Sequence, residues 1–218
     1  ISMNDEYAGI CGITKEELLN NMSEDIDMLA KSLGYTRDVT IAKLKEHYDG
    51  YHFSKVSPDV FNPYSLLNCF AKRELGAYWF GSGTPTYLIN MMRKKGAVPT
   101  DITRVEADES EFDAPTEEMT TIMPLLYQSG YITIKDYNRD YNYYTLDVPN
   151  KEVKVGLTKA LIPSYVTPNT LATTNTARRI AQALDKQDMD GALHLLQDFL
   201  GTVPYCNVTN YEGHYQQM

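Results

Sequence analysis

Apolar residues recur at helical spacing along the first fifty positions of the chain. A helix is predicted after Thr14, because Thr14 and Glu17 have the spacing of a capping box, in which each side chain satisfies the other residue's backbone N–H. A second helix should end at Gly34, since glycine readily takes the left-handed conformation of a helix C-terminus. A third begins near Thr36. The apolar faces of the second and third helices are Ile26, Leu29, Ala30, Leu33, Ile41, Leu44 and Tyr48. Residues 14–48 are therefore predicted to form a small helical bundle.

Turn signals follow this bundle. Asp49-Gly50 predicts a sharp turn, because glycine accepts positive φ at no steric cost. Short extended segments are expected at 51–53 and 60–61. Asn62-Pro63 predicts a helix start, since asparagine caps the helix and proline has no N–H to leave unpaired in its first turn. Thr84-Pro85 repeats the same device further along the chain.

The pattern between residues 97 and 116 is acidic and irregular. No helical or alternating period stands out there, and acidic side chains crowd its second half at Asp108, Glu109, Glu111 and Asp113. We interpret this segment as a surface connection and as the boundary between two domains.

Two periodicities alternate in the next block. One helical face is formed by Met119, Ile122, Met123 and Leu126. Gly130 should end that helix, and residues 131–137 and 141–148 then alternate as two strands around Asn138-Arg139-Asp140, which predicts a hairpin. Pro149-Asn150 starts a further helix with an apolar face of Val153, Leu157 and Leu161. The order helix, hairpin, helix is compatible with a winged-helix-like unit.

The last third of the chain is predicted to be helical. Its two apolar stripes are Ala177, Ile180, Ala181 and Leu184, and then Met189, Ala192, Leu193, Leu196 and Leu200. The expected fold class is therefore mainly α with small β-hairpins, an α+β fold. We expect a helical bundle, then the winged-helix-like unit, then C-terminal helices.

Composition places the chain among ordinary globular proteins, with 43% hydrophobic and 22% charged residues. The net charge of −9 disfavours strong non-specific binding of nucleic acid, because affinity for phosphate comes largely from Lys and Arg. No apolar run approaches the ~20 residues needed to span a bilayer, and no signal peptide is evident. We expect a cytoplasmic protein with no membrane partner.

Cysteine and histidine give little support to a metal site or a nucleophile. The three cysteines are far apart and form no CxxC pair, and Cys69 falls on a helix where packing is the simpler interpretation. No histidine lies four residues from another histidine or a cysteine. We interpret His47 and His194 as helix-surface residues and expect His52 to hydrogen-bond across its turn.

A P-loop is also missing from the sequence. Binding of a nucleotide phosphate by that motif requires GxxxxGK[ST], whose glycines let backbone N–H groups approach the phosphates. Gly81-Ser82-Gly83-Thr84 is the only glycine-rich candidate, and it lacks the lysine. We therefore expect this chain neither to bind a nucleotide or metal cofactor nor to catalyse ATP hydrolysis by itself.

Several short motifs in the same order resemble one family over nearly the whole chain. They are Ile1-Ser2-Met3, Ile10-Cys11-Gly12-Ile13-Thr14, Tyr48-Asp49-Gly50-Tyr51-His52-Phe53, Asn62-Pro63-Tyr64-Ser65-Leu66-Leu67, Tyr78-Trp79-Phe80 with Gly83-Thr84-Pro85-Thr86-Tyr87-Leu88, and Tyr127-Gln128-Ser129-Gly130-Tyr131. The family comprises large, mostly bacterial proteins that join an AAA-type ATPase-like domain to a C-terminal PD-(D/E)XK nuclease-like domain.

The resemblance implies that the chain is a middle portion of such a parent protein. Residues 1–100 would be a helical lid-like part of the ATPase-like region, 101–168 the winged-helix-like unit, and 169–218 a helical connector toward the nuclease-like domain. The parent would use ATP and Mg²⁺. Glu212 resembles the helix-borne acid of the nuclease-like site, but without partner carboxylates it cannot hold a metal ion.

The block from Tyr48 to Phe53 has two interpretations. It could contact a nucleotide or the neighbouring ATPase-like domain. Alternatively, Asp49-Gly50 makes the turn while Tyr48, Tyr51 and Phe53 pack the bundle, and we favour this structural role because aromatic residues beside a turn usually belong to the core. We interpret the Asn62-Pro63 motif in the same structural way.

The resemblance leads to a non-catalytic function. We expect the chain to relay nucleotide state between the other domains of its parent, or to fix their relative geometry. One alternative is a winged-helix DNA-binding module, and another is an incomplete part of a metal-dependent nuclease. DNA binding is disfavoured because the cations near the hairpin are closely offset by acids. The cations are Lys135, Arg139, Lys151, Lys154 and Lys159, and the acids are Asp136, Asp140, Asp147 and Glu152.

Overall fold

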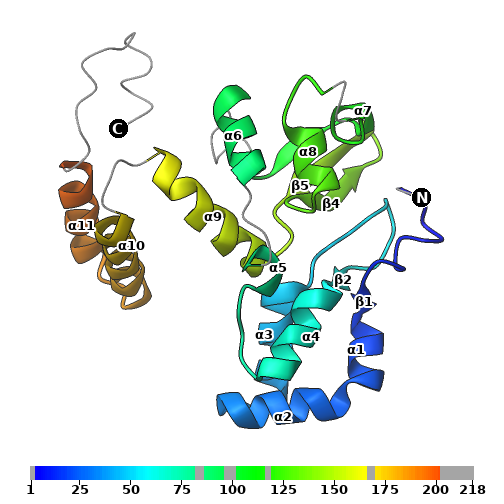
Figure 1. The fold of residues 1–218 in the computed structure, drawn as a ribbon, viewed down its shortest axis with the longest axis horizontal. Helices are drawn as coiled ribbons and strands as arrows, with labels where there is room; N and C mark the ends of the chain where they lie inside the picture. The colour runs from blue at the N-terminus through cyan, green and yellow to red at the C-terminus, as the bar shows by residue number, and fades with distance from the viewer. Residues whose placement is uncertain (1–2, 82–85, 96–101, 116–118, 166–169, 202–218) are drawn as a thin grey trace. The chain divides into compact units, whose positions relative to one another are not determined.

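The computed structural model describes residues 3–81, 86–95, 102–115, 119–165 and 170–201 (Figure 1). These residues form helices and two small antiparallel sheets, which confirms the predicted α+β, mainly helical fold class. Contacts along the chain divide it into two compact units, Ile1–Leu161 and Ile162–Met218. The division into three functional parts that the family resemblance implies stays a prediction.

The beginning of the first unit is the predicted helical bundle. It contains α1 (Lys15–Asn21), α2 (Ser23–Leu33), α3 (Arg37–Tyr48) and α4 (Pro63–Lys72), with β1 (Ile13–Thr14) paired antiparallel to β2 (Val60–Phe61). The capping box of Thr14 and Glu17, the left-handed Gly34 and the Asn62 cap are all present. The core of this part is formed by Leu18, Ile26, Leu29, Leu44, Tyr48, Phe61, Leu66 and Cys69.

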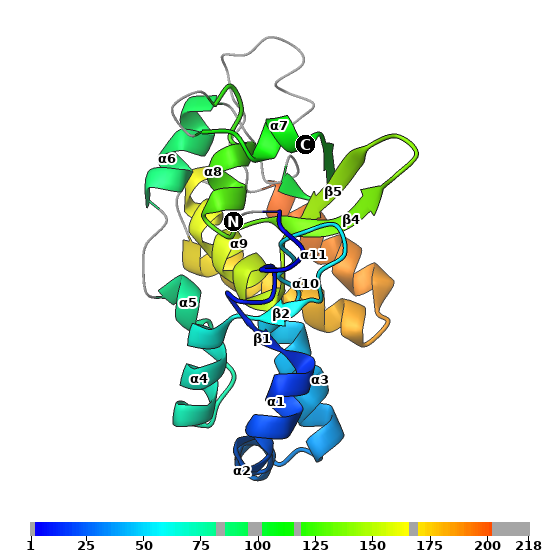
Figure 2. The ribbon, with the colours of Figure 1, turned by 90° about the vertical axis from the view of Figure 1, so that its right-hand side faces the viewer.

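The remainder of the first unit is built around a three-stranded sheet. Its elements are α5 (Tyr78–Gly81), α6 (Thr86–Lys95), β3 (Val105–Ala107), α7 (Glu109–Phe112), α8 (Met123–Gln128), β4 (Thr133–Asn138), β5 (Tyr143–Asp147) and α9 (Lys151–Tyr165). The sheet order is β3-β5-β4, with Leu146 opposite both Val105 and Ile134. The predicted hairpin is therefore confirmed, and Figure 2 shows its tip projecting away from α8.

The prediction of a surface connection at 97–116 was wrong for its described part. Residues 105–107 form β3, and Asp108 with Glu111 makes a capping box for α7. Phe112 at the end of α7 is fully buried, with its ring centroid 4.8 Å from that of Tyr127 and 5.2 Å from that of Tyr144. A three-residue strand has almost no period of its own, so only its pairing with β5 defines it. The acidic side chains at its flanks concealed it in the sequence.

Of two further predicted helix starts, one lies at a different residue in the structure and the other lies outside the described residues. The helix predicted from Met119 begins only at Met123, because Pro124 occupies its first turn, where its missing N–H costs nothing. The Thr84-Pro85 start lies outside the described residues. The helix that follows it, α6, runs as far as Lys95.

The second unit contains the predicted C-terminal helices, α10 (Thr170–Asp185) and α11 (Met189–Gly201). They pack side by side as a hairpin (Figures 1 and 2). Gln187 adopts φ 60° in the turn, and the Asp188 carboxylate accepts the backbone N–H of Gly191 at 2.9 Å, which caps α11.

Gly50 occupies the predicted turn and meets two requirements at once. Its φ is +94°, which L-residues with a side chain rarely adopt. A Cβ at this position would also overlap the carbonyl oxygen of Pro149 and approach the Lys135 Nζ to 2.9 Å. The turn therefore brings the main chain after α3 into direct contact with the loop after β5.

Replacement of Gly50 by valine should reduce the free energy of unfolding by roughly 2–4 kcal/mol, because positive φ and steric overlap both oppose the side chain. Urea denaturation measures the effect. Gly34→Ala is a matched control: Gly34 has φ +69° but no atom within 4 Å of an added Cβ. Its loss should be smaller, about 1 kcal/mol, from backbone strain alone. Equal losses in the two variants would contradict the close approach at Gly50.

Candidate functional site

The Tyr48–Phe53 block starts inside the helical core. Tyr48 is fully buried, its hydroxyl donates to the Gly76 carbonyl at 3.0 Å, and it accepts the Gly76 N–H at 2.9 Å. Burial raises the pKa of Tyr48 far above its ordinary value, so the hydroxyl stays protonated and can keep both bonds. This tyrosine therefore ties the end of α3 to the loop before α5.

The same block then reaches the three-stranded sheet through main-chain hydrogen bonds. The Thr133 hydroxyl accepts the His52 N–H at 2.9 Å and donates to the His52 carbonyl at 2.8 Å, although the residues lie 81 positions apart. The Lys135 Nζ donates to the carbonyls of Gly50 at 2.7 Å and of Pro149 at 2.9 Å. We call these contacts, together with those of Glu152 described below, the polar junction.

Two acids beside the junction have opposite electrostatic environments. The Asp59 carboxylate lies 3.3 Å from the His52 Nδ1, and this hydrogen bond lowers the pKa of Asp59. The contact is the bond across the turn expected for His52. Asp49 is only 4% exposed, and burial raises the pKa of its carboxyl group despite nearby Lys45 and Lys135. One Asp49 oxygen, Oδ1, has no hydrogen-bond partner among the described residues.

Glu152, in the first turn of α9, is the most deeply placed acid of the junction. It is 3% exposed, and its Oε1 accepts the Trp79 N–H at 2.7 Å, which connects α9 to the start of α5. Burial raises the pKa of Glu152, while hydrogen bonds from Ser65 and the α5 backbone oppose that rise. Its Oε2 has no partner among the described residues.

The sequence analysis missed Glu152 as a site residue and counted it only as a neutralising charge. Acids in the first turn of a helix are usually solvated and stabilise the helix dipole, so the position carried no signal of burial. A contact of Phe80 explains how α5 can lie so close to α9. Its ring lies on Gly156 of α9, where a Cβ would overlap the ring atoms.

Two of the five cations considered for DNA binding are occupied within the protein. Lys135 makes the two bonds described above, and desolvation of its ammonium group lowers its pKa, although much of the side chain stays exposed. Lys151 pairs with Glu46 at 2.8 Å, and Lys43 contacts the same carboxylate at 2.9 Å. These two partners lower the pKa of Glu46 to about 2.

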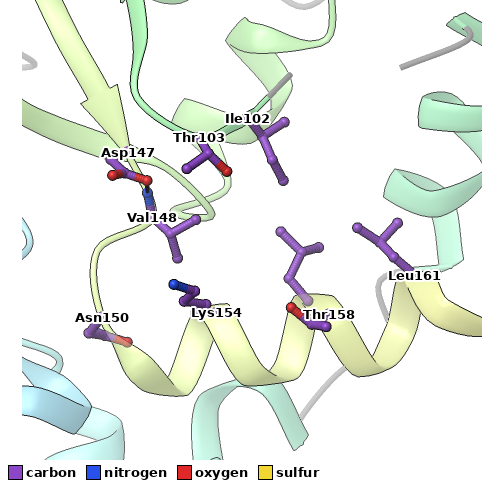
Figure 3. Close-up of a pocket in the computed structure, with 9 residues that line it drawn as sticks. Ile102, Thr103, Asp147, Val148, Asn150, Lys154, Thr158 and Leu161 are labelled. Atoms are coloured by element: carbon purple, nitrogen blue, oxygen red, sulfur yellow. Dashed lines mark hydrogen bonds between the residues drawn. The ribbon is translucent and has the colours of Figure 1, made fainter. Parts of the chain in front are cut away.

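A hollow of about 380 Å³ lies between α9 and the end of β5 (Figure 3). Ile102, Val148 and Leu161 give it an apolar lining from both sides, and Lys154 and Thr158 project from α9. The Asp147 carboxylate at its edge already accepts the Val148 N–H at 2.7 Å. The polar residues in its lining are Thr103, Asp147, Asn150, Lys154 and Thr158.

The other residues singled out in the sequence lie apart from the junction. Cys69 is fully buried, and burial raises the pKa of its thiol to about 11, so it packs rather than reacts. His47 is half-buried rather than on the surface, with its Nδ1 2.8 Å from the Lys43 carbonyl oxygen. His194 is exposed. Glu212 lies outside the described residues.

Within the described ranges, no group of three or more His, Cys, Asp or Glu side chains could hold a metal ion. Among the same residues, no helix is long and apolar enough to cross a membrane.

Comparison with known proteins gives one significant curated relative. The chain is 29% identical over 222 residues to an uncharacterized protein in the vnfD 5'region of Azotobacter chroococcum mcd 1. The alignment covers 99% of this chain and 40% of that protein, so the chain spans less than half of its relative's length. No protein-family profile matches the chain, and no solved structure matches it.

The raised pKa of Glu152 predicts a specific pH dependence of stability. A carboxyl group whose pKa is higher in the folded than in the unfolded state favours folding when protonated, so its contribution decreases as pH rises through that interval, starting near 4.5. Glu152→Gln should remove this decrease. Chemical denaturation between pH 4.5 and pH 8 measures it.

Glu46 provides the opposite control. Its folded pKa of about 2 stabilises the fold above the unfolded value near 4.5, and this contribution is lost as pH falls. Glu46→Gln should therefore flatten the acid side of the stability profile; at neutral pH it should lower the free energy of unfolding without changing its dependence on pH. If the free energy of unfolding of the wild-type chain changed with pH in the same way as that of Glu152→Gln, ionisation of Glu152 would not destabilise the fold, and the prediction would be wrong.

Proposed function

We propose that this chain is a non-catalytic connector in a larger protein with an ATPase-like and a nuclease-like domain, and that it fixes their relative geometry. The observation that carries this proposal is the polar junction. Its hydrogen bonds join residues 50–52 to 133–135, and Trp79 to Glu152, across 73 to 85 positions of sequence. The bonds from residues 50–52 to residues 133–135 hold the helical bundle and the three-stranded part in one arrangement, and the Trp79–Glu152 bond fixes α5 against α9.

The length of the relative supports a place within a larger protein. That protein is more than twice as long as this chain, which matches 40% of it. The motif order given above is the basis for assigning the remaining parts to ATPase-like and nuclease-like domains. In the parent, ATP and Mg²⁺ would then be bound outside this chain.

The order of elements supports a winged-helix-like unit within the connector. Helix α6, strand β3, helices α7 and α8, and the β4–β5 hairpin follow one another, and the sheet order β3-β5-β4 is the one that winged helices have. In a DNA-binding winged helix, the helix before the hairpin enters the major groove and reads base edges with polar or basic side chains.

Helix α8 is the helix before the hairpin, and its side chains pack within the protein. Its sequence, MPLLYQ, contains no lysine or arginine. Tyr127 packs against Phe112, and the Gln128 side-chain amide donates to the Ala114 carbonyl at 2.7 Å. These contacts favour a role in protein packing over DNA recognition.

Hydrogen exchange measures the rigidity of the junction directly. The amides of His52 and Trp79 donate across the junction. They should be as protected as those of Leu44 in the core of the helical bundle and of Leu146 in the core around the three-stranded sheet, because the junction opens only with the whole first unit. Lys135→Met should speed exchange at His52 by roughly 5-fold, equivalent to about 1 kcal/mol for a partly exposed ammonium group.

Lys159→Met is the matched control, since Lys159 is exposed on α9 and away from the junction contacts. It should leave the exchange at His52 unchanged. If the amides of His52 and Trp79 exchanged rapidly in the wild-type chain while those of Leu44 and Leu146 stayed protected, the junction would open independently of the cores. That result would contradict a connector of fixed geometry.

Binding measurements separate the connector from the two alternatives. Calorimetry with ATP and Mg²⁺ should give no binding heat for the purified chain, because the sequence contains no P-loop. Duplex DNA should show no mobility shift even at low salt, where phosphate contacts are strongest. A micromolar ATP signal would overturn the domain assignment, and a salt-sensitive DNA shift would favour the winged-helix DNA-binding alternative.

A further inference from the structure

The hollow between α9 and the end of β5 is charged at one end and apolar at the other. Figure 3 shows Asp147 and Lys154 at the first end and Ile102 and Leu161 at the second. Its volume of about 380 Å³ lies near the lower limit of small-molecule sites, which measure about 300–1,000 Å³. Such sites combine an apolar lining with a few polar groups that orient the ligand. The charged end therefore indicates the chemistry of a ligand.

An acid and a base line the charged end without pairing with each other. The Asp147 carboxylate, at the end of β5, accepts the N–H of the next residue at 2.7 Å. The Lys154 ammonium has no hydrogen-bond or ion-pair partner among the described residues. Lys135 acts on Asp147 electrostatically, but its ammonium donates to two backbone carbonyls. Both an anionic and a cationic group therefore remain available to a ligand.

Thr158 adds a hydroxyl group to the cationic side of the hollow. It follows Lys154 by four residues, which places both side chains on the same face of α9. Within the described part of the chain, the Thr158 hydroxyl also makes no hydrogen bond. A carboxylate can accept hydrogen bonds from an ammonium and a hydroxyl group at once, and such charge-assisted bonds are stronger than neutral ones. This side of the hollow therefore suits a carboxylate.

We propose that the hollow binds a free amino acid with an aliphatic side chain, such as leucine. Its α-carboxylate accepts hydrogen bonds from Lys154 and Thr158, and its α-ammonium group pairs with Asp147. Its side chain packs against Ile102 and Leu161 at the apolar end. A ligand with a single charge would leave either Asp147 or Lys154 without a partner, whereas a zwitterion matches both. This ligand site is independent of the proposed connector function.

Calorimetry of the 218-residue chain with L-leucine and two of its analogues tests the ligand class. Isoamylamine is leucine without the carboxylate, and 4-methylpentanoate is leucine without the ammonium group. Each analogue binds about 5-fold more weakly than leucine, as expected for the loss of one partly exposed ion pair. Equal affinities for the three ligands would overturn the proposal, because apolar contacts alone would then explain the binding. So would the absence of leucine binding at about 10 mM.

Two variants assign the charged partners of the ligand. Lys154→Met weakens leucine binding by about 5-fold but does not weaken isoamylamine, which has no carboxylate. Asp147→Asn weakens leucine by a similar factor but does not weaken 4-methylpentanoate, which has no ammonium group. The asparagine side chain can still accept the backbone N–H that Asp147 accepts.

Lys159→Met is the matched control, because Lys159 is exposed on α9 and does not line this hollow. It leaves all three affinities unchanged, and circular dichroism shows that the variants keep their helices. Leucine binding that Lys154→Met and Asp147→Asn both leave unchanged would lie elsewhere on the chain and would overturn the site. Loss of folding in Asp147→Asn would leave Lys154→Met, at an exposed position, to decide between these outcomes.

Discussion

The first unit depends on the contact between the turn after α3 and the loop after β5. Gly50 makes this contact possible, since its positive φ turns the main chain and its missing side chain lets the Pro149 carbonyl approach. The Lys135 ammonium then bridges the two carbonyls. Backbone carbonyls removed from water require hydrogen bonds, so a cation between them satisfies both and fixes their distance. This contact fixes the turn after α3 against the loop after β5, although the two segments lie far apart in the sequence.

Burial of acids gives this junction an electrostatic character unlike that of the surface. Asp49 and Glu152 have raised pKa values because water is excluded, whereas Glu46 on the surface has a lowered pKa because two lysines contact it. The same residue type thus has opposite effects on stability at the two locations.

Helices α8 and α11 differ in how far their side chains are covered by the described part of the protein. In the first unit, the helix before the hairpin is occupied by contacts with Phe112 and Ala114, so its side chains are committed to the fold. In the second unit, large apolar side chains remain in contact with water. Exposed apolar patches of this kind usually mark protein interaction sites.

Local signals in the sequence determined most of the elements. The capping box at Thr14, the Asn62-Pro63 start, the left-handed Gly34 and Gly130, and the hairpin around residues 138–140 were all identified correctly. Each depends on residues within a few positions of one another, whose conformational preferences act in any context. The motif at Tyr48–Phe53 was also identified, but from resemblance, and its contacts were unknown.

Only the tertiary structure revealed β3, the burial of Phe112 and the position of Glu152. Strand β3 has three residues and exists because β5, about forty positions later, supplies its hydrogen bonds. Glu152 is buried because Trp79 and Phe80 approach α9, where Gly156 leaves space. Burial depends on which distant segments exclude water from a side chain. The sequence near that side chain does not contain this information, so these features were decided by the fold as a whole.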